Sequence, residues 1–308
     1  MSSFLNQPDW LWVPVVLFAA LAQTFRNTAQ RSLTTELGIW PATLVRFLYG
    51  LPFALVYLAA LYLFFAPARL LPAFSWAYVA WIGFGAAFQI GATAALLLAM
   101  KERNFAVAVT LAKTEVLQVA LFAVVFLHEL PTALGLLAMV LATLGVVVLS
   151  LPARGQWRSL SAWLSRPALY GLAAGAGFAL ATVCFRGGAL ELNAESPWVS
   201  SAWGVLLAQG LQSLAMGLWV SRCTPQGLAP LWRAWRVSLL TGAMGAAASI
   251  AWFTGYALQS VGNVRTLGMV EVVFSYVISR RVFSEQIRWQ EKTGMAMMVA
   301  GLVLICLR

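Results

Sequence analysis

The stretch TLAKTEVLQVALFAVVFLHE, residues 110–129, decides how this sequence is organised, because it aligns without a gap with TLGMVEVVFSYVISRRVFSE at 266–285. In this alignment Glu115 falls on Glu271. Apolar residues often match by chance between two membrane helices, but charged residues at the same positions rarely do. The match therefore indicates a structural unit that occurs twice in the chain.

The duplication extends outward from this pair. FAALAQTFR at 18–26 matches FALATVCFR at 178–186 and aligns the arginine that ends each segment. We predict two five-helix repeats, residues 1–151 and 167–308. The linker between them, 152–166, alternates apolar side chains with arginines, which predicts a short helix lying in the membrane interface.

The composition is that of a membrane protein. Of the 308 residues, 61% are hydrophobic and 10% are charged, and mean hydropathy is +0.82. A soluble domain carries about 25% charged residues, so these values exclude an ordinary soluble enzyme, a disordered chain and a coiled coil. The only histidine is His128, and the three cysteines are far apart, so no metal cluster or disulfide framework is visible.

We expect an all-α integral membrane fold, because a helix needs about 20 apolar residues to cross a bilayer. Ten such spans are predicted, at residues 10–33, 40–65, 75–99, 104–127, 132–151, 167–188, 197–221, 236–258, 262–280 and 290–307.

Five helices are an odd number, so the second repeat must enter the membrane in the opposite orientation to the first. Loop charges agree: the loop after 110–129 has no Lys or Arg, whereas the equivalent loop after 266–285 is basic. By the positive-inside rule, both termini are expected outside the cytoplasm of a multi-pass protein in the cytoplasmic (inner) membrane. Most of the net charge of +10 then sets orientation rather than indicating nucleic acid. Inverted repeats are typical of transporters whose substrate site lies near the midplane.

With its ten spans, the segment WPATLVRFLYGLPFA at 40–54 and the paired glutamates, the chain resembles the drug/metabolite transporter superfamily in its EamA-type branch. The resemblance implies that spans 1–4 and 6–9 enclose a central cavity, that spans 5 and 10 lie outside it, and that a small organic solute crosses the membrane. The chain departs from the family at AKTEV and GMVEV, where members commonly have a proline. Members are also usually drawn with both termini in the cytoplasm.

Charged residues inside the spans are the clearest functional signal, since each is costly in a membrane unless it faces a partner or a cavity. Five are positive and two are negative, which favours a carboxylate, phosphate or zwitterionic substrate over the competing lipophilic cation. They are Arg26, Arg46, Lys113, Glu115, Arg186, Arg265 and Glu271.

Gln23, Arg26, Asn27 and Gln30 follow the spacing i, i+3, i+4, i+7 and so share one helix face. Such a stripe lines a polar cavity or makes hydrogen bonds between helices, and both interpretations remain open.

A second cluster combines Thr114 and Gln118, four residues apart, with Lys113 and Glu115. Side chains at i and i+2 of a helix point apart, so each charge needs a partner elsewhere, for instance Arg26 for Glu115. Arg46 is an alternative partner. Glu115 and Glu271 are expected either to form static ion pairs or to bind substrate or protons.

Further candidates for substrate binding or coupling are polar and aromatic residues predicted within the other spans. The alternative to substrate binding is that the Arg46 side chain extends to the membrane interface. For the uncharged residues the alternative is packing between helices. They are Arg46, Arg186, Gln89, Trp252, Tyr256 and Ser275.

The sequence thus favours a secondary transporter that moves a charged or zwitterionic metabolite by alternating access, either proton-coupled or as a facilitator. The alternative is a translocase of lipid head groups on the same fold. An integral-membrane enzyme is disfavoured because HExxH and GxSxG motifs are absent. The P-loop motif is absent too, so ATP is not expected as the energy source. No cofactor or nucleic-acid partner is expected, and either a monomer or a homodimer is compatible.

Overall fold

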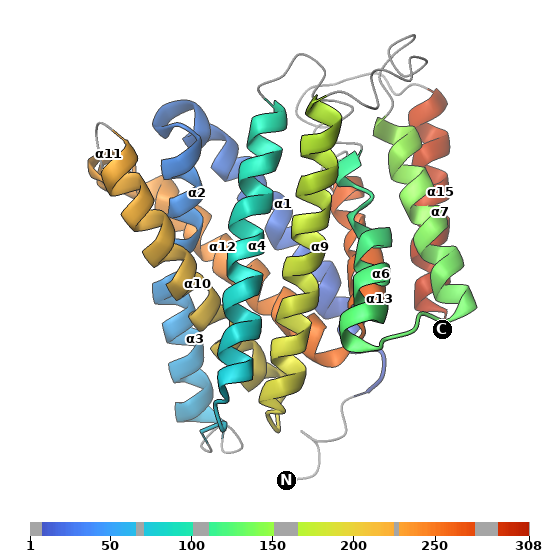
Figure 1. Ribbon diagram of the computed structural model, residues 1–308, viewed down its shortest axis with the longest axis horizontal. Helices are drawn as coiled ribbons and strands as arrows, with labels where there is room; N and C mark the ends of the chain where they lie inside the picture. The colour runs from blue at the N-terminus through green and yellow to red at the C-terminus, as the bar shows by residue number, and fades with distance from the viewer. Residues whose placement is uncertain are drawn as a thin grey trace. The chain divides into compact units, whose positions relative to one another are not determined.

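The computed structural model describes residues 8–65, 71–100, 111–150, 166–224, 228–274 and 289–307, and all secondary structure in these ranges is helical (Figure 1). The helices are α1 (Trp12–Leu37), α2 (Ile39–Leu48), α3 (Leu51–Phe64), α4 (Trp76–Met100), α6 (Glu115–Leu127), α7 (Ala133–Ser150), α9 (Arg166–Leu192), α10 (Pro197–Cys223), α11 (Ala229–Arg233), α12 (Trp235–Leu258), α13 (Val261–Gly268) and α15 (Trp289–Cys306).

The all-α membrane class predicted from the sequence is confirmed. Among the described residues, five helical segments are long and apolar enough to cross a membrane: Ile39–Phe64, Trp76–Leu96, Ala168–Leu192, Pro197–Cys223 and Trp235–Leu258. Helical residues also occur in the other predicted spans, in shorter or more polar helices, so the number of ten spans stays a prediction. All but the last residue of the predicted linker, 152–166, lies outside the described residues.

Three of the predicted spans contain an interrupted helix. Between α2 and α3 the chain turns at Tyr49 and Gly50, just before Pro52, whose missing N–H is harmless in the first turn of α3. A turn at Lys113–Thr114 precedes α6, and a turn at Met269 follows α13. The backbone tightens there to bonds between residues three apart, from the Thr114 N–H to Leu111 and from the Met269 N–H to Thr266. In the repeat alignment, position 113 corresponds to position 269.

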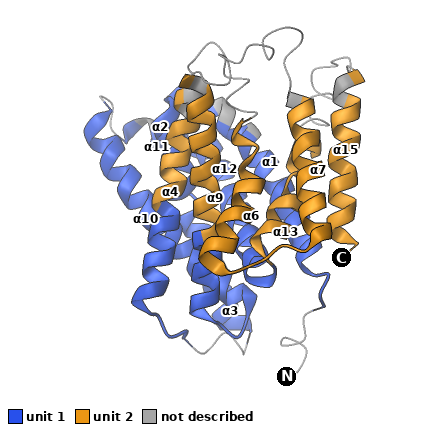
Figure 2. Cartoon of the chain, turned by 45° about the vertical axis from the view of Figure 1, so that its right-hand side comes forward, with its two compact units in different colours: residues 1–86, 184–259 blue, residues 87–183, 260–308 orange. Residues whose placement is uncertain are grey.

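By the contacts between its residues the chain divides into two compact units, coloured blue and orange in Figure 2. Unit 1 comprises residues 1–86 and 184–259. Within it, α12 packs along α1 and also contacts α2, α3 and α10. Glycines allow the closest approaches: a β-carbon at Gly242 of α12 would lie 2.5 Å from the carbonyl of Tyr49. In the same unit, Gly187 of α9 packs against the Trp81 ring of α4.

Unit 2 comprises residues 87–183 and 260–308. Here α7 packs along α15, and α13 contacts α6, α7 and α15. The α7–α15 contact uses small residues: a β-carbon at Gly301 would lie 2.7 Å from the backbone nitrogen of Ala142 and 2.8 Å from the carbonyl oxygen of Ala138. Both alanines are fully buried. Close backbone approach of this kind is how membrane helices associate, and it occurs here within one chain.

Candidate functional site

Two arginines from neighbouring helices of unit 1 lie against the same glycine. Arg26 of α1 is a charged residue, yet it is only 5% exposed. A β-carbon at Gly245 of α12 would lie 3.4 Å from Cδ of Arg26 and 3.6 Å from Cγ of Arg46. The stems of both arginines therefore lie against α12 at a position where the helix has no side chain.

The polar stripe of α1 makes hydrogen bonds to other segments at both of its ends. At one end, Nε1 of Trp252 donates to Oε1 of Gln23 at 2.9 Å, and at the other, Nε2 of Gln30 donates to the carbonyl of Ala42 at 3.3 Å. These are hydrogen bonds between helices. In the middle, Nε and Nη2 of Arg26 donate to Oδ1 of Asn27 at 3.2 and 2.7 Å. Asn27 itself is exposed, whereas the charged Arg26 is buried.

Arg186 of α9 contacts the end of α12. Its Nη1 donates to the carbonyl of Tyr256, and also to that of Ala257 at 3.3 Å. The last carbonyls of a helix have no partner within it and carry its negative dipole end, so a guanidinium is well placed there. The Tyr256 ring is buried and stacks on Trp252, with centroids 6.2 Å apart and planes 22° from parallel. Arg186 thus binds the end of α12 about one turn after Trp252.

In unit 2, Glu115 and Arg265 form an ion pair, with 2.6 Å between Oε1 and Nη2. This corrects the expectation that Arg26 or Arg46 would pair with Glu115. Glu115 begins α6 and Arg265 lies in the last turn of α13, so each charge also complements the dipole of its own helix. In the sequence Arg265 is one of the charges inside the spans, but it is not among the predicted site residues. Its lack of an oppositely charged neighbour in sequence was the signal that it needed one in space.

Lys113 and Glu271 also interact electrostatically with Glu115. Together with Arg265 they make a cluster of two cations and two anions, which sums to zero. The charges predicted within the spans of unit 1 are Arg26, Arg46 and Arg186, all positive. The excess positive charge among the seven residues predicted within the spans therefore lies entirely in unit 1.

Thr114 and Gln118 support the turn that precedes α6. Oγ1 of Thr114 donates to the carbonyl of Leu111 at 2.6 Å, and Nε2 of Gln118 donates to Oγ1 of Thr114 at 2.9 Å. On α9, Gly175 leaves room for this amide, since a β-carbon there would lie 3.0 Å from Nε2 of Gln118. These two candidates hold the segment that presents Lys113 and Glu115.

The remaining candidates are Gln89 and Ser275. Gln89 is half-buried on α4 in unit 2, and its carbonyl accepts from Oγ1 of Thr93 at 2.8 Å. Ser275 lies outside the described residues. Glu129, which follows α6, accepts from the first N–H of α13, that of Val261, at 3.3 Å. Across the described ranges, no group of three or more His, Cys, Asp or Glu side chains is arranged to hold a metal ion.

Known proteins are similar to this chain in part of its sequence and in its fold. Residues 165–307 match the EamA-like transporter family. The EamA-like match indicates a multi-pass membrane protein and a transporter of the drug/metabolite type. One solved protein crystal structure aligns over 96% of this chain and 96% of its own, with a TM-score of 0.71 and 18% identity, a likeness of fold alone. No curated protein matches the sequence.

Proposed function

We propose that this EamA-like protein is a secondary transporter that carries a small organic anion or zwitterion across the membrane by alternating access. The observation that carries the proposal is the placement of Arg26 beside Arg46 against Gly245 of α12. Burying one cation in a membrane protein is costly, and bringing two together adds their repulsion. A carboxylate or phosphate bound between the two guanidiniums would offset both costs, with the bidentate hydrogen bonds that guanidinium favours.

The charge balance of unit 2 argues against the competing cationic substrate. A lipophilic cation would need an available carboxylate, but Glu115 is already paired with Arg265. Lys113 adds positive charge near the same carboxylate. The charges therefore favour an anionic substrate in unit 1 over a cationic substrate in unit 2, where the charge cluster is already neutral.

Two interruptions of the backbone support alternating access. The interruptions at Lys113–Thr114 and Met269 occupy corresponding positions of the aligned repeats. Broken helices at corresponding positions of inverted repeats are common at transporter binding sites. The sequence has no P-loop that would indicate ATP as the energy source. We further propose that a proton gradient drives transport and that Glu115 or Glu271 takes up the proton. Without such coupling the protein acts as a facilitator.

We also propose that the protein lies in the cytoplasmic membrane with both termini outside the cytoplasm, on the loop charges of the sequence. Its oligomeric state is either monomer or homodimer.

The proposal is tested by thermal-shift and uptake measurements on purified protein, using amino acids, carboxylates, phosphate esters and organic cations. Arg26→Gln should weaken binding of the active anion by about 10- to 100-fold, the range for a hydrogen bond to a charged group. Arg222→Gln removes a cation from the exposed end of α10 and should bind as the wild type does. Arg26→Lys keeps the charge and should retain part of the affinity.

Uptake of cations only, or an Arg26→Gln affinity equal to that of Arg222→Gln, would reject the anion site. If lipids that carry the same head group compete with the soluble anion, the head-group translocase is favoured over a solute carrier.

A further inference from the structure

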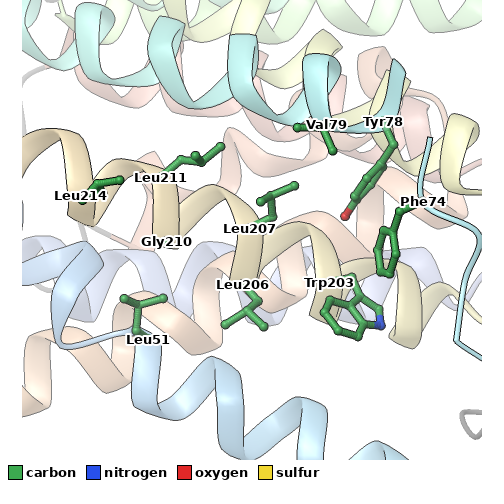
Figure 3. Close-up of a pocket in the computed structure, with 10 residues that line it drawn as sticks. All are labelled: Leu51, Phe74, Tyr78, Val79, Trp203, Leu206, Leu207, Gly210, Leu211 and Leu214. Atoms are coloured by element: carbon green, nitrogen blue, oxygen red, sulfur yellow. The ribbon is translucent and has the colours of Figure 1, made fainter. Parts of the chain in front are cut away.

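An apolar groove of about 530 Å³ lies in unit 1 between α3, α4 and α10. Leucines of α10 form its floor, among them Leu207 and Leu211, and Phe74 and Trp203 stand at one end (Figure 3). None of the candidate residues for the charged substrate lines it. The groove is thus a separate feature of unit 1, and the identity of its occupant does not depend on the proposed function.

The groove belongs to the part of the chain that faces the bilayer. Its three walls come from Ile39–Phe64, Trp76–Leu96 and Pro197–Cys223, all of which are long and apolar enough to be membrane spans. Residues on its rim are open, with Phe74 48% and Leu214 63% exposed. Apolar residues exposed on membrane spans contact lipid, so the bilayer itself supplies the natural occupant of this groove.

One polar group in the groove is unusual. Tyr78 is 1% exposed, and its hydroxyl has no hydrogen-bond partner among the described residues. Figure 3 shows this hydroxyl directed from α4 toward α10, into the space that the leucines line. A hydroxyl held among apolar side chains without a partner is unfavourable, because its hydrogen bonds to water are lost and not replaced. An occupant that offers an acceptor at this point would remove the cost.

The groove is polar and aromatic at one end and apolar at the other. Nε1 of Trp203 donates to the hydroxyl of Tyr62 at 3.1 Å, and the Phe74 ring meets the Trp203 ring edge-on at 5.0 Å. Tyr78 is in the first turn of α4, and aromatic residues at helix ends mark the membrane interface. From Trp203 to Leu214 the helix rises about 16 Å, which takes the groove from that interface toward the hydrocarbon core.

We propose that this groove is a binding site for one acyl chain of a membrane phospholipid, with an ester carbonyl of the lipid accepting a hydrogen bond from the Tyr78 hydroxyl. The ester groups of a phospholipid lie at the interface and its chains extend inward, which is the order of polar and apolar groups along the groove. The lipid is a resident ligand of unit 1, distinct from any transported solute.

The test exploits a glycine in the groove. Gly210 lines the groove and a β-carbon there meets no atom within 4 Å, so a phenylalanine at this position is expected to extend into the groove. Gly217, on the same helix but not lining the groove, is equally open and is the matched control. Phosphatidylcholine with brominated chains, titrated into detergent-purified protein, quenches nearby tryptophans. The signal of Trp203 is isolated by comparison with Trp203→Phe.

Saturable quenching of Trp203, reversed by unbrominated phosphatidylcholine, is expected for the wild type and for Gly217→Phe. Gly210→Phe should lose it. Tyr78→Phe should weaken the lipid by about 3- to 10-fold, as loss of one hydrogen bond predicts, yet leave the melting temperature of lipid-free protein unchanged or higher.

Non-saturable quenching that is equal in both glycine variants would overturn the proposal. So would conversion of a dimer to a monomer by Gly210→Phe alone, since a second copy of the chain would then be the occupant. If Gly210→Phe fails to fold, the Tyr78→Phe comparison decides, and unchanged lipid affinity in that variant would count against the site.

Discussion

Nη2 of Arg265 lies 2.6 Å from Oε1 of Glu115, and this contact joins the last turn of α13 to the first turn of α6. The side chains are 19% and 12% exposed, so the pair is largely removed from solvent. Both helices are short and flank an interruption of the backbone. The ion pair therefore joins the two interrupted segments of unit 2.

Removing one partner of this pair should destabilise the protein strongly. Arg265→Gln leaves the Glu115 carboxylate without its partner, and loss of one partner of a buried pair costs about 3–5 kcal/mol. The cost should appear as a lower melting temperature of purified protein in detergent. The double variant Glu115→Gln, Arg265→Gln should recover much of the loss, because no uncompensated charge remains, and a double-mutant cycle measures the coupling. If the two single losses simply add, the residues are not coupled.

Two glycines one turn apart on α12 should respond differently to alanine. At Gly242 the added β-carbon would lie 2.5 Å from the backbone carbonyl of Tyr49, so helices must move and about 1–3 kcal/mol of stability should be lost. At Gly245 the nearest atoms are at 3.4 Å, an ordinary contact, so Gly245→Ala should be neutral or stabilising by about 0.5–1 kcal/mol through helix propensity. Thermal unfolding of the two variants makes the comparison.

The larger variant Gly245→Leu tests the arginines rather than the packing alone. Its side chain occupies the space along which the stems of Arg26 and Arg46 run, so the anion-induced thermal shift should fall while the protein stays folded. An undiminished shift would show that the anion binds elsewhere.

The membrane orientation is tested by reporters fused to the C-terminus. From the loop charges we expect alkaline phosphatase to be active there, because it works outside the cytoplasm, and a cytoplasm-dependent fluorescent protein to be dark. Adding arginines to the loop after α6 should weaken this preference. The opposite pair of signals would mean that the loop charges do not set the orientation.

The helical membrane fold was predictable because hydrophobic runs of sufficient length are written directly in the sequence. The partner of Glu115 was not, since Arg265 is remote in sequence and only the folded backbone brings the two together. The interruption before α6 is not evident from the sequence either. The apolar periodicity continues through LAKTEV, and the turn at Thr114 depends on a local hydrogen bond that its side chain makes to Leu111. The stripe on α1 was found by its spacing, but its division into helix contacts and a charged centre depends on Trp252.

The turns at Lys113–Thr114 and Met269 also restrict which parts of the surface hydrocarbon can touch. A continuous helix can face lipid because every N–H and C=O within it is bonded to its own chain. Where bonds shift to residues three apart, some of these backbone groups must be solvated by something else, and hydrocarbon offers neither donor nor acceptor. Both turns must therefore face protein or water, whichever way the molecule is inserted. The surface of the protein that contacts lipid chains must exclude them.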